Sequence, residues 1–199
     1  MANKLKIEIG EFLLIIPPNN KVNSEVFPIK KRFDSDYGCP YSGNLTPHIT
    51  LTNFLQYEMM ENRIVQRLES FSKSIRPFNI DLRGFGGFPA HSIYVNILKK
   101  KPIVEIVKGI RSNFTHILKF DEKYKPIFVT TPHLTIARGM TKAQYDRAFS
   151  EWQNKQFNSG FYANKMMLLK RLPGSSYHIV KTFSFTGGDF DGFQLELPF

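Results

Sequence analysis

The segment Pro-His-Ile-Thr-Leu at residues 47–51 returns as Pro-His-Leu-Thr-Ile at residues 132–136, and this pair of segments decides the expected fold. In an extended strand, residues i and i+2 point to the same face. Each copy therefore presents a histidine and a threonine on one face and two aliphatic side chains on the other. This arrangement predicts two half-buried strands of the same design.

The predicted elements nearly repeat, because a helix and then two strands follow each copy of the motif. Helices are predicted from apolar stripes at helical spacing and from a capping box between Thr141 and Gln144. Strands are predicted from period-two alternation or a short apolar run. The helices are expected at about 58–74, from Pro102 to Ile117 and at 141–152, and the strands at 12–16, 47–51, 78–82, 93–97, 132–136, 167–169 and 179–185.

Three further segments carry weaker patterns. The residues after the first strand have helical spacing, although Pro28 lies among them. Residues 34–46 are rich in Asp, Gly, Pro and Ser and are predicted as a loop, and residues 84–88 as a glycine-rich connection between strands. The apolar positions of the possible helix are Val22, Val26, Ile29 and Phe33.

The order of elements predicts an α+β fold with helices packed outside the sheets. No linker or low-complexity tract separates parts of the chain, so residues 1–199 are expected to form a single unit. The near repeat predicts two related lobes that face each other across a cleft. A pseudo-twofold axis would then bring the two histidine motifs together.

Charge and composition narrow the class of partner. The chain carries a net charge of +10, which favours a polyanionic partner, although evenly spread lysines would serve solubility alone. Cys39 is the only cysteine, so a disulfide framework is excluded and a cytoplasmic location is expected. The apolar run at 12–16 is too short to span a membrane, and no membrane association is expected.

The histidines His48 and His133 are the candidate catalytic residues. Imidazole titrates near neutrality, so one copy can accept a proton while the other donates one. In-line displacement at phosphate needs such a pair, and threonine hydroxyls can donate to the nonbridging oxygens. The other histidines lack metal-ligand spacing, so no metal and no cofactor are expected; they are His91, His116 and His178.

On these motifs the chain resembles the 2H phosphoesterase superfamily, and in particular its 2′-5′ RNA ligase-like (LigT-like) branch. The resemblance rests on His-Ile-Thr-Leu-Thr-Asn-Phe (48–54) and His-Leu-Thr-Ile-Ala-Arg (133–138). It implies a bilobal α+β fold in which two antiparallel sheets line a central basic cleft, with metal-independent chemistry on 2′,3′-cyclic phosphates or 2′-5′ linkages. It also implies that the catalytic pair is His48 and His133, and that phosphate is bound by Thr50, Thr135 and Arg138.

The expected substrate is RNA or a nucleotide that ends in a cyclic phosphate, and the protein is expected to be a monomer. Phe88 is expected to stack on a base beside the cleft. The basic runs Lys99–Lys101 and Lys170–Arg171 would rim a groove for RNA. Two alternatives stay open: a binding module for RNA ends without turnover, and a phosphodiesterase for a small cyclic nucleotide or cyclic ADP-ribose phosphate.

Overall fold

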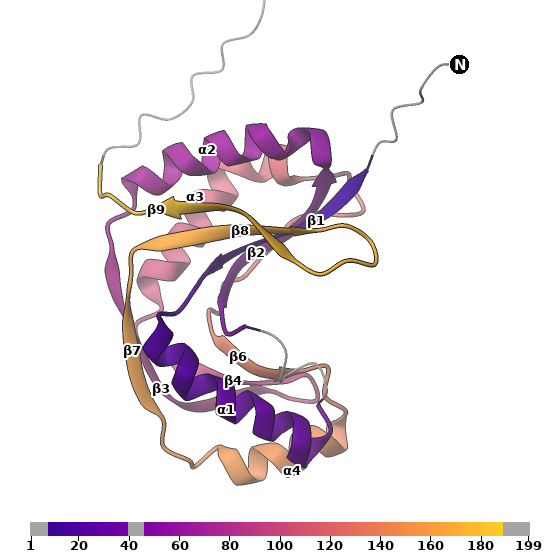
Figure 1. Ribbon diagram of the computed structural model, residues 1–199, viewed down its shortest axis with the longest axis vertical. Coiled ribbons are helices and arrows are strands. Elements are labelled where there is room, and N and C mark those ends of the chain that lie inside the picture. Colours follow the sequence, from indigo (N-terminus) through magenta and orange to yellow (C-terminus); the bar gives the residue numbers. More distant parts are fainter. Residues whose placement is uncertain (1–7, 40–45, 189–199) are drawn as a thin grey trace, which may run out of the picture.

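A curled, nine-stranded antiparallel sheet with two α-helices packed against each half forms the body of the molecule (Figure 1). The structure, a computed structural model, describes residues 8–39 and 46–188. The predicted α+β fold is confirmed. The helices are α1 Asn20–Tyr37, η1 Glu58–Met60, α2 Glu61–Ser74, α3 Lys101–Leu118 and α4 Lys142–Trp152; the strands are β1 Ile9–Ile16, β2 Ile49–Tyr57, β3 Phe78–Phe88, β4 Ser92–Ile97, β5 Ile127–Phe128, β6 Leu134–Arg138, β7 Asn158–Ala163, β8 Lys165–Arg171 and β9 His178–Ser184.

The two expected sheets are halves of one sheet, in the order β7-β3-β4-β6-β2-β1-β8-β9, with β5 pairing β2 off this path. The motif strands β6 and β2 are neighbours at its centre, where Ile49 lies opposite Leu134. Helices α1 and α4 pack on the lower lobe, which contains β3, β4, β6 and β7, and α2 and α3 on the upper lobe (Figure 1). Each lobe therefore takes strands from both halves of the sequence.

The first motif strand contains a β-bulge directly after its threonine. In the pairing of β1 with β2, Ile15 lies opposite Thr50 and Leu14 opposite Thr52, so Leu51 has no partner on β1. A bulge of this kind reverses the alternation of side chains beyond it. Thr52 is accordingly buried, and its hydroxyl donates to the carbonyl oxygen of Ile127 at 2.9 Å.

The second motif strand contains a bulge at the equivalent position. In the pairing of β4 with β6, Tyr94 lies opposite Thr135 and Ile93 opposite Ala137, so Ile136 is the extra residue. Ala137 is buried with 1% of its surface exposed, whereas the following residue, Arg138, is exposed. The bulge thus turns the Arg138 side chain to the same face of the sheet as His133 and Thr135.

Helix α1 is longer than predicted, because residues 34–37 belong to it rather than to the expected 34–46 loop. Asn19 caps its first turn, and Tyr37 packs its ring at 5.0 Å from that of Phe33, which packs in turn on Trp152 of α4. These contacts between residues far apart in the sequence extend the helix to Tyr37, where Gly38 caps it. Residues 40–45 of the predicted loop lie outside the described residues.

The buried stripe of α1 also differs from the prediction. It comprises Val22, Val26, Lys30, Phe33 and Tyr37, with Lys30 where Ile29 was expected.

The predicted glycine-rich connection at 84–88 is wrong, since these residues continue β3. Glycine suits this stretch because aromatic rings press on its backbone. A Cβ on Gly86 would lie 2.6 Å from the Tyr94 ring, and one on Gly87 would clash with the Tyr145 hydroxyl. Strands β5 and β7 were not predicted.

The contact that joins the lobes gives a test of the fold. Leu134 is fully buried opposite Ile49, so Leu134→Ala should lower the free energy of unfolding by about 2–5 kcal/mol in urea titrations. Leu98→Ala, at a leucine that is 52% exposed, is the matched control and should change it by less than about 0.5 kcal/mol. Equal effects of the two substitutions would contradict the central role of this pair.

Candidate active site

The two motif histidines are oriented by identical hydrogen bonds. The Nδ1 atom of His48 lies 2.8 Å from the carbonyl oxygen of Thr46, and that of His133 lies 2.7 Å from the carbonyl oxygen of Thr131. In both places proline stands between threonine and histidine, and the residue before a proline favours an extended backbone. The repeated motif is therefore one residue longer than the five-residue segments, since it begins at these threonines.

This geometry fixes the tautomer of both rings. A carbonyl oxygen only accepts hydrogen bonds, so Nδ1 must carry the proton in each imidazole. The Nε2 atom then holds a lone pair when the ring is neutral and a proton when it is charged. Each histidine is thus prepared to act as a base or as an acid through Nε2.

The histidines and threonines of the two motifs share one face of the sheet. Because Ile49 lies opposite Leu134 in an antiparallel pair, extending this register by one residue places His48 opposite Thr135 and Thr50 opposite His133. All four lie on the face away from Ile49 and Leu134, which are fully buried. The structure therefore brings the four together, as the sequence predicted.

His48 lies among positive charges. Burial lowers its pKa, the hydrogen bond to the Thr46 carbonyl raises it, and the charges of Lys30, Arg138 and His133 lower it further. The net result is a pKa below the ordinary value of 6.5. The effect of His133 on the pKa of His48 also places the two imidazoles within electrostatic reach of each other.

His133 lies in an aromatic setting. Its ring centroid is 5.1 Å from that of Phe88 and 4.9 Å from that of Tyr94. Burial lowers the pKa of His133, the Thr131 carbonyl raises it, and the charges of Lys100 and His91 lower it, so it too lies below 6.5. Phe88, expected to stack on a base, is thus in the site and packs against the imidazole.

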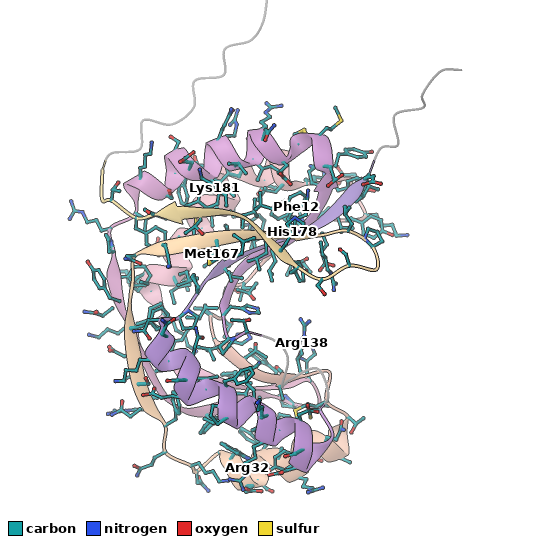
Figure 2. The ribbon with its side chains drawn as sticks, in the orientation of Figure 1. Phe12, Arg32, Arg138, Met167, His178 and Lys181 are labelled. Atoms are coloured by element: carbon teal, nitrogen blue, oxygen red, sulfur yellow. The ribbon has the colours of Figure 1, made fainter. Side chains whose placement is uncertain are left out.

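Arg138 extends from β6 toward the space between the lobes (Figure 2). Among the described residues it has no carboxylate within salt-bridge distance. Its charge acts on His48 and on Tyr177 of the opposite lobe. The guanidinium can therefore meet an anion placed beside the two histidines.

A pocket of about 710 Å³ adjoins His48 on the upper lobe. Its lining is mainly apolar and also includes Tyr177 and His178. His133 does not line it. The apolar residues are Leu13, Ile15, Met167, Leu169 and Ile179.

A hydrogen-bonded cluster around Glu11 holds two residues that line this pocket, Arg171 and Tyr177. The carboxylate accepts from Asn53 at 2.9 Å, from Tyr177 at 2.7 Å and from the Nε atom of Arg171 at 2.7 Å. Burial opposes ionisation of Glu11, but these bonds outweigh it and hold its pKa below the usual value. Asn53 follows His48 by five residues, as Arg138 follows His133. Because Asn53 is neutral and Glu11 is paired with Arg171, the charges beside the first motif are already balanced.

The two basic runs that were expected to rim an RNA groove differ in their surroundings. Lys100 lowers the pKa of His133, but Lys170 forms ion pairs with Glu58 and Glu61 at 2.6 Å and does not rim the groove.

Within residues 8–39 and 46–188 no group of three His, Cys, Asp or Glu could hold a metal ion. No helix of the same residues is long and apolar enough to cross a membrane.

The site also contains residues that the sequence reasoning missed. Tyr94 could have been identified from the sequence, because it lies between Ile93 and Val95, whose side chains were expected to point to the opposite face of the strand. Lys30 and Tyr177 depend on contacts between distant elements.

Comparison with known proteins identifies relatives over most of the chain. A family model described as the 2′-5′ RNA ligase superfamily matches residues 21–174. A protein of Oceanobacillus iheyensis, assigned by its name to the phosphoesterases, is 26% identical over 173 residues, which cover 85% of this chain and 95% of the relative. A similarly named protein of Bacillus anthracis is 25% identical over 179 residues, covering 88% and 97%.

Solved structures agree with the fold. Escherichia coli LigT complexed with 3′-AMP matches with a TM-score of 0.60 and 14% identity, covering 90% of this chain and 99% of LigT. The protein TT0787 of Thermus thermophilus matches with a TM-score of 0.61 and 16% identity, covering 90% and 100%.

The tautomer and the pKa values can be measured directly. Long-range ¹H–¹⁵N spectra should show both site imidazoles protonated at Nδ1 when neutral, and both should titrate below pH 6.5. Added phosphate should raise both pKa values, because an anion favours imidazolium. Spectra of His48→Ala and His133→Ala assign the signals. Protonation at Nε2 in either neutral ring would contradict the hydrogen bonds to the threonine carbonyls.

Proposed function

The chain belongs to the 2′-5′ RNA ligase superfamily and is an enzyme of the phosphoesterase type, and from this premise we propose that its substrate is a 2′,3′-cyclic phosphate at the end of RNA or of a nucleotide. The observation that carries the proposal is the matched pair of imidazoles. Both bond a carbonyl through Nδ1 and leave Nε2 for the substrate, on the face that also bears two threonines.

In the proposed reaction, the phosphorus atom lies between the two Nε2 atoms. One imidazole takes a proton from water as the water oxygen bonds to phosphorus. The other imidazole gives a proton to the ribose oxygen as its bond to phosphorus breaks. The hydroxyls of Thr50 and Thr135 and the guanidinium of Arg138 stabilise the charge on the nonbridging oxygens.

The position of the pocket supports one orientation of the substrate. A nucleoside has a flat base that suits an apolar pocket with a few polar groups at its rim. Because the pocket adjoins His48 and not His133, a nucleoside bound there brings its ribose oxygens to His48. We therefore assign proton donation to His48 and activation of water to His133.

The same pair serves ligation, in which a different nucleophile opens the cyclic phosphate. If a ribose 5′-hydroxyl takes the place of water, the product is a 2′-5′ linkage in place of a terminal phosphate. The geometry at phosphorus is alike in the two reactions, so hydrolysis and ligation remain two outcomes of one site. The bound 3′-AMP in the LigT structure supports a nucleotide ligand for this fold.

Removal of either imidazole should abolish most of the activity. We expect His48→Ala and His133→Ala each to lower turnover of 2′,3′-cyclic nucleotides by about 10²-fold or more, since each loses an acid or a base. Thr50→Val and Thr135→Val should lose about tenfold, the scale of one hydrogen bond to a charged group. His116→Ala, at an exposed histidine of α3, is the control and should retain the wild-type rate.

These assays should be run with and without chelator, and the rate should not change. Wild-type turnover in either site-histidine variant would contradict the paired mechanism. Activity that returns only with an added divalent ion would contradict metal-independent chemistry.

A second experiment separates the enzyme from a binding module. With a net charge of +10, the protein should bind single-stranded RNA through phosphate contacts, and the affinity should fall steeply as salt rises. His48→Ala/His133→Ala should keep this binding and lose all turnover. Binding at two salt concentrations and turnover should be measured on both proteins.

RNA binding without turnover in the wild-type protein would favour the binding module. Turnover of small cyclic nucleotides without RNA binding would favour the small-molecule phosphodiesterase.

A further inference from the structure

Lys30 is a buried cation in the core of the lower lobe. It belongs to the buried stripe of α1, and 2% of its surface is exposed. Its Nζ atom donates to the carbonyl oxygens of Thr135 at 3.3 Å and Ile136 at 3.1 Å, and no ion pair joins it to a carboxylate of residues 8–39 and 46–188. Burial of an ammonium without an acid opposes folding, and an aliphatic residue would suit this stripe better.

The two carbonyls that Lys30 contacts belong to the bulge of β6. This bulge aims Arg138 and Thr135 at the same face of the sheet. By holding it, the ammonium acts on the orientation of the second motif. An ammonium has three donors, and these contacts use two of them.

The first motif provides an internal comparison. There the bulge residue is Leu51, and its carbonyl oxygen accepts the backbone N–H of Val129 at 3.0 Å. A neutral backbone amide thus donates to the bulge carbonyl in the first motif, whereas the charged ammonium of Lys30 does so in the second. Because bulge carbonyls do not require a charge, the charge of Lys30 needs another explanation.

The charge of Lys30 acts on His48, one of the two motif histidines. It lowers the pKa of His48, as does Arg138. Burial and the charge of Arg138 in turn lower the pKa of Lys30 to about 8, so the ammonium is still mainly protonated at pH 7. Lys30, Arg138 and His48 therefore lie close enough to affect one another at the junction of the lobes, and no described acid lies among them. A bound phosphate would balance this positive charge.

We propose that Lys30 is a positioning residue of the phosphate site: it holds the bulge that aims Thr135 and Arg138, and its buried charge strengthens the binding of a phosphate anion beside His48. The inference rests on the proposed function in taking phosphate as the ligand, but it does not require turnover. It adds a residue from α1, outside both motifs, to the site.

The test compares Lys30→Gln and Lys30→Met with Lys31→Gln. The control removes the same charge from the next residue of α1, which is exposed. Three quantities are measured: the melting temperature, the affinity for inorganic phosphate by calorimetry, and the pKa of His48 by NMR. Both Lys30 variants should melt at or above the wild-type temperature, bind phosphate about tenfold more weakly or worse, and show a raised His48 pKa, while the control matches wild type.

Unchanged phosphate affinity and unchanged His48 pKa in a folded Lys30 variant would overturn the proposal. So would the failure of both Lys30 variants to fold when Lys31→Gln folds, since the ammonium would then serve folding alone. A wild-type protein that binds no phosphate would overturn it as well. If wild type binds phosphate with the expected response to Lys30 but turns over no cyclic phosphate, the inference stands and the proposed substrate is wrong.

Discussion

The rest of the structure depends on the antiparallel contact between the two motif strands, where Ile49 lies opposite Leu134. This contact joins a sheet whose two lobes each contain strands from both halves of the chain. It also brings each histidine opposite the threonine of the other motif. The candidate site therefore cannot form within one half of the sequence, and it exists only when both lobes have assembled around this pair.

The residues of the site could be predicted from the sequence because the rule that links them is local. Two short segments with alternating side chains suffice to place His48 with Thr50 and His133 with Thr135 on one face. The same rule fails for Arg138, which an unbroken alternation would turn to the core side. Its true direction follows from the bulge at Ile136, and that bulge is set by the register with β4, which lies far away in the sequence. Arg138 could be expected only through the family resemblance.

The fold shows the same division between local and distant causes. Helices α3 and α4 have apolar stripes and start signals within their own sequence, and both were predicted. The last turn of α1 depends on the contact of its aromatic rings with Trp152, and residues 84–88 form a strand because Tyr94 and Tyr145 pack on glycine backbone. No local pattern reports such contacts. Lys30 was missed for this reason, since a lysine in an apolar stripe reads as a break in the pattern until its carbonyl partners are known.

The two motifs supply the site with matching histidines and threonines, but the surroundings of the two histidines differ. These differences can give the histidines different roles. Two imidazoles in identical settings would have identical pKa values and no assigned roles, yet proton transfer at phosphorus needs one donor and one acceptor. The motifs differ where they meet their surroundings: Asn53 joins a balanced cluster around Glu11, whereas the equivalent Arg138 stays available for an anion. The apolar pocket adjoins His48, and the aromatic rings of Phe88 and Tyr94 adjoin His133. In the proposed function the base of the nucleotide lies in the pocket beside His48, and this orientation, rather than the histidines themselves, assigns which imidazole gives a proton and which takes one.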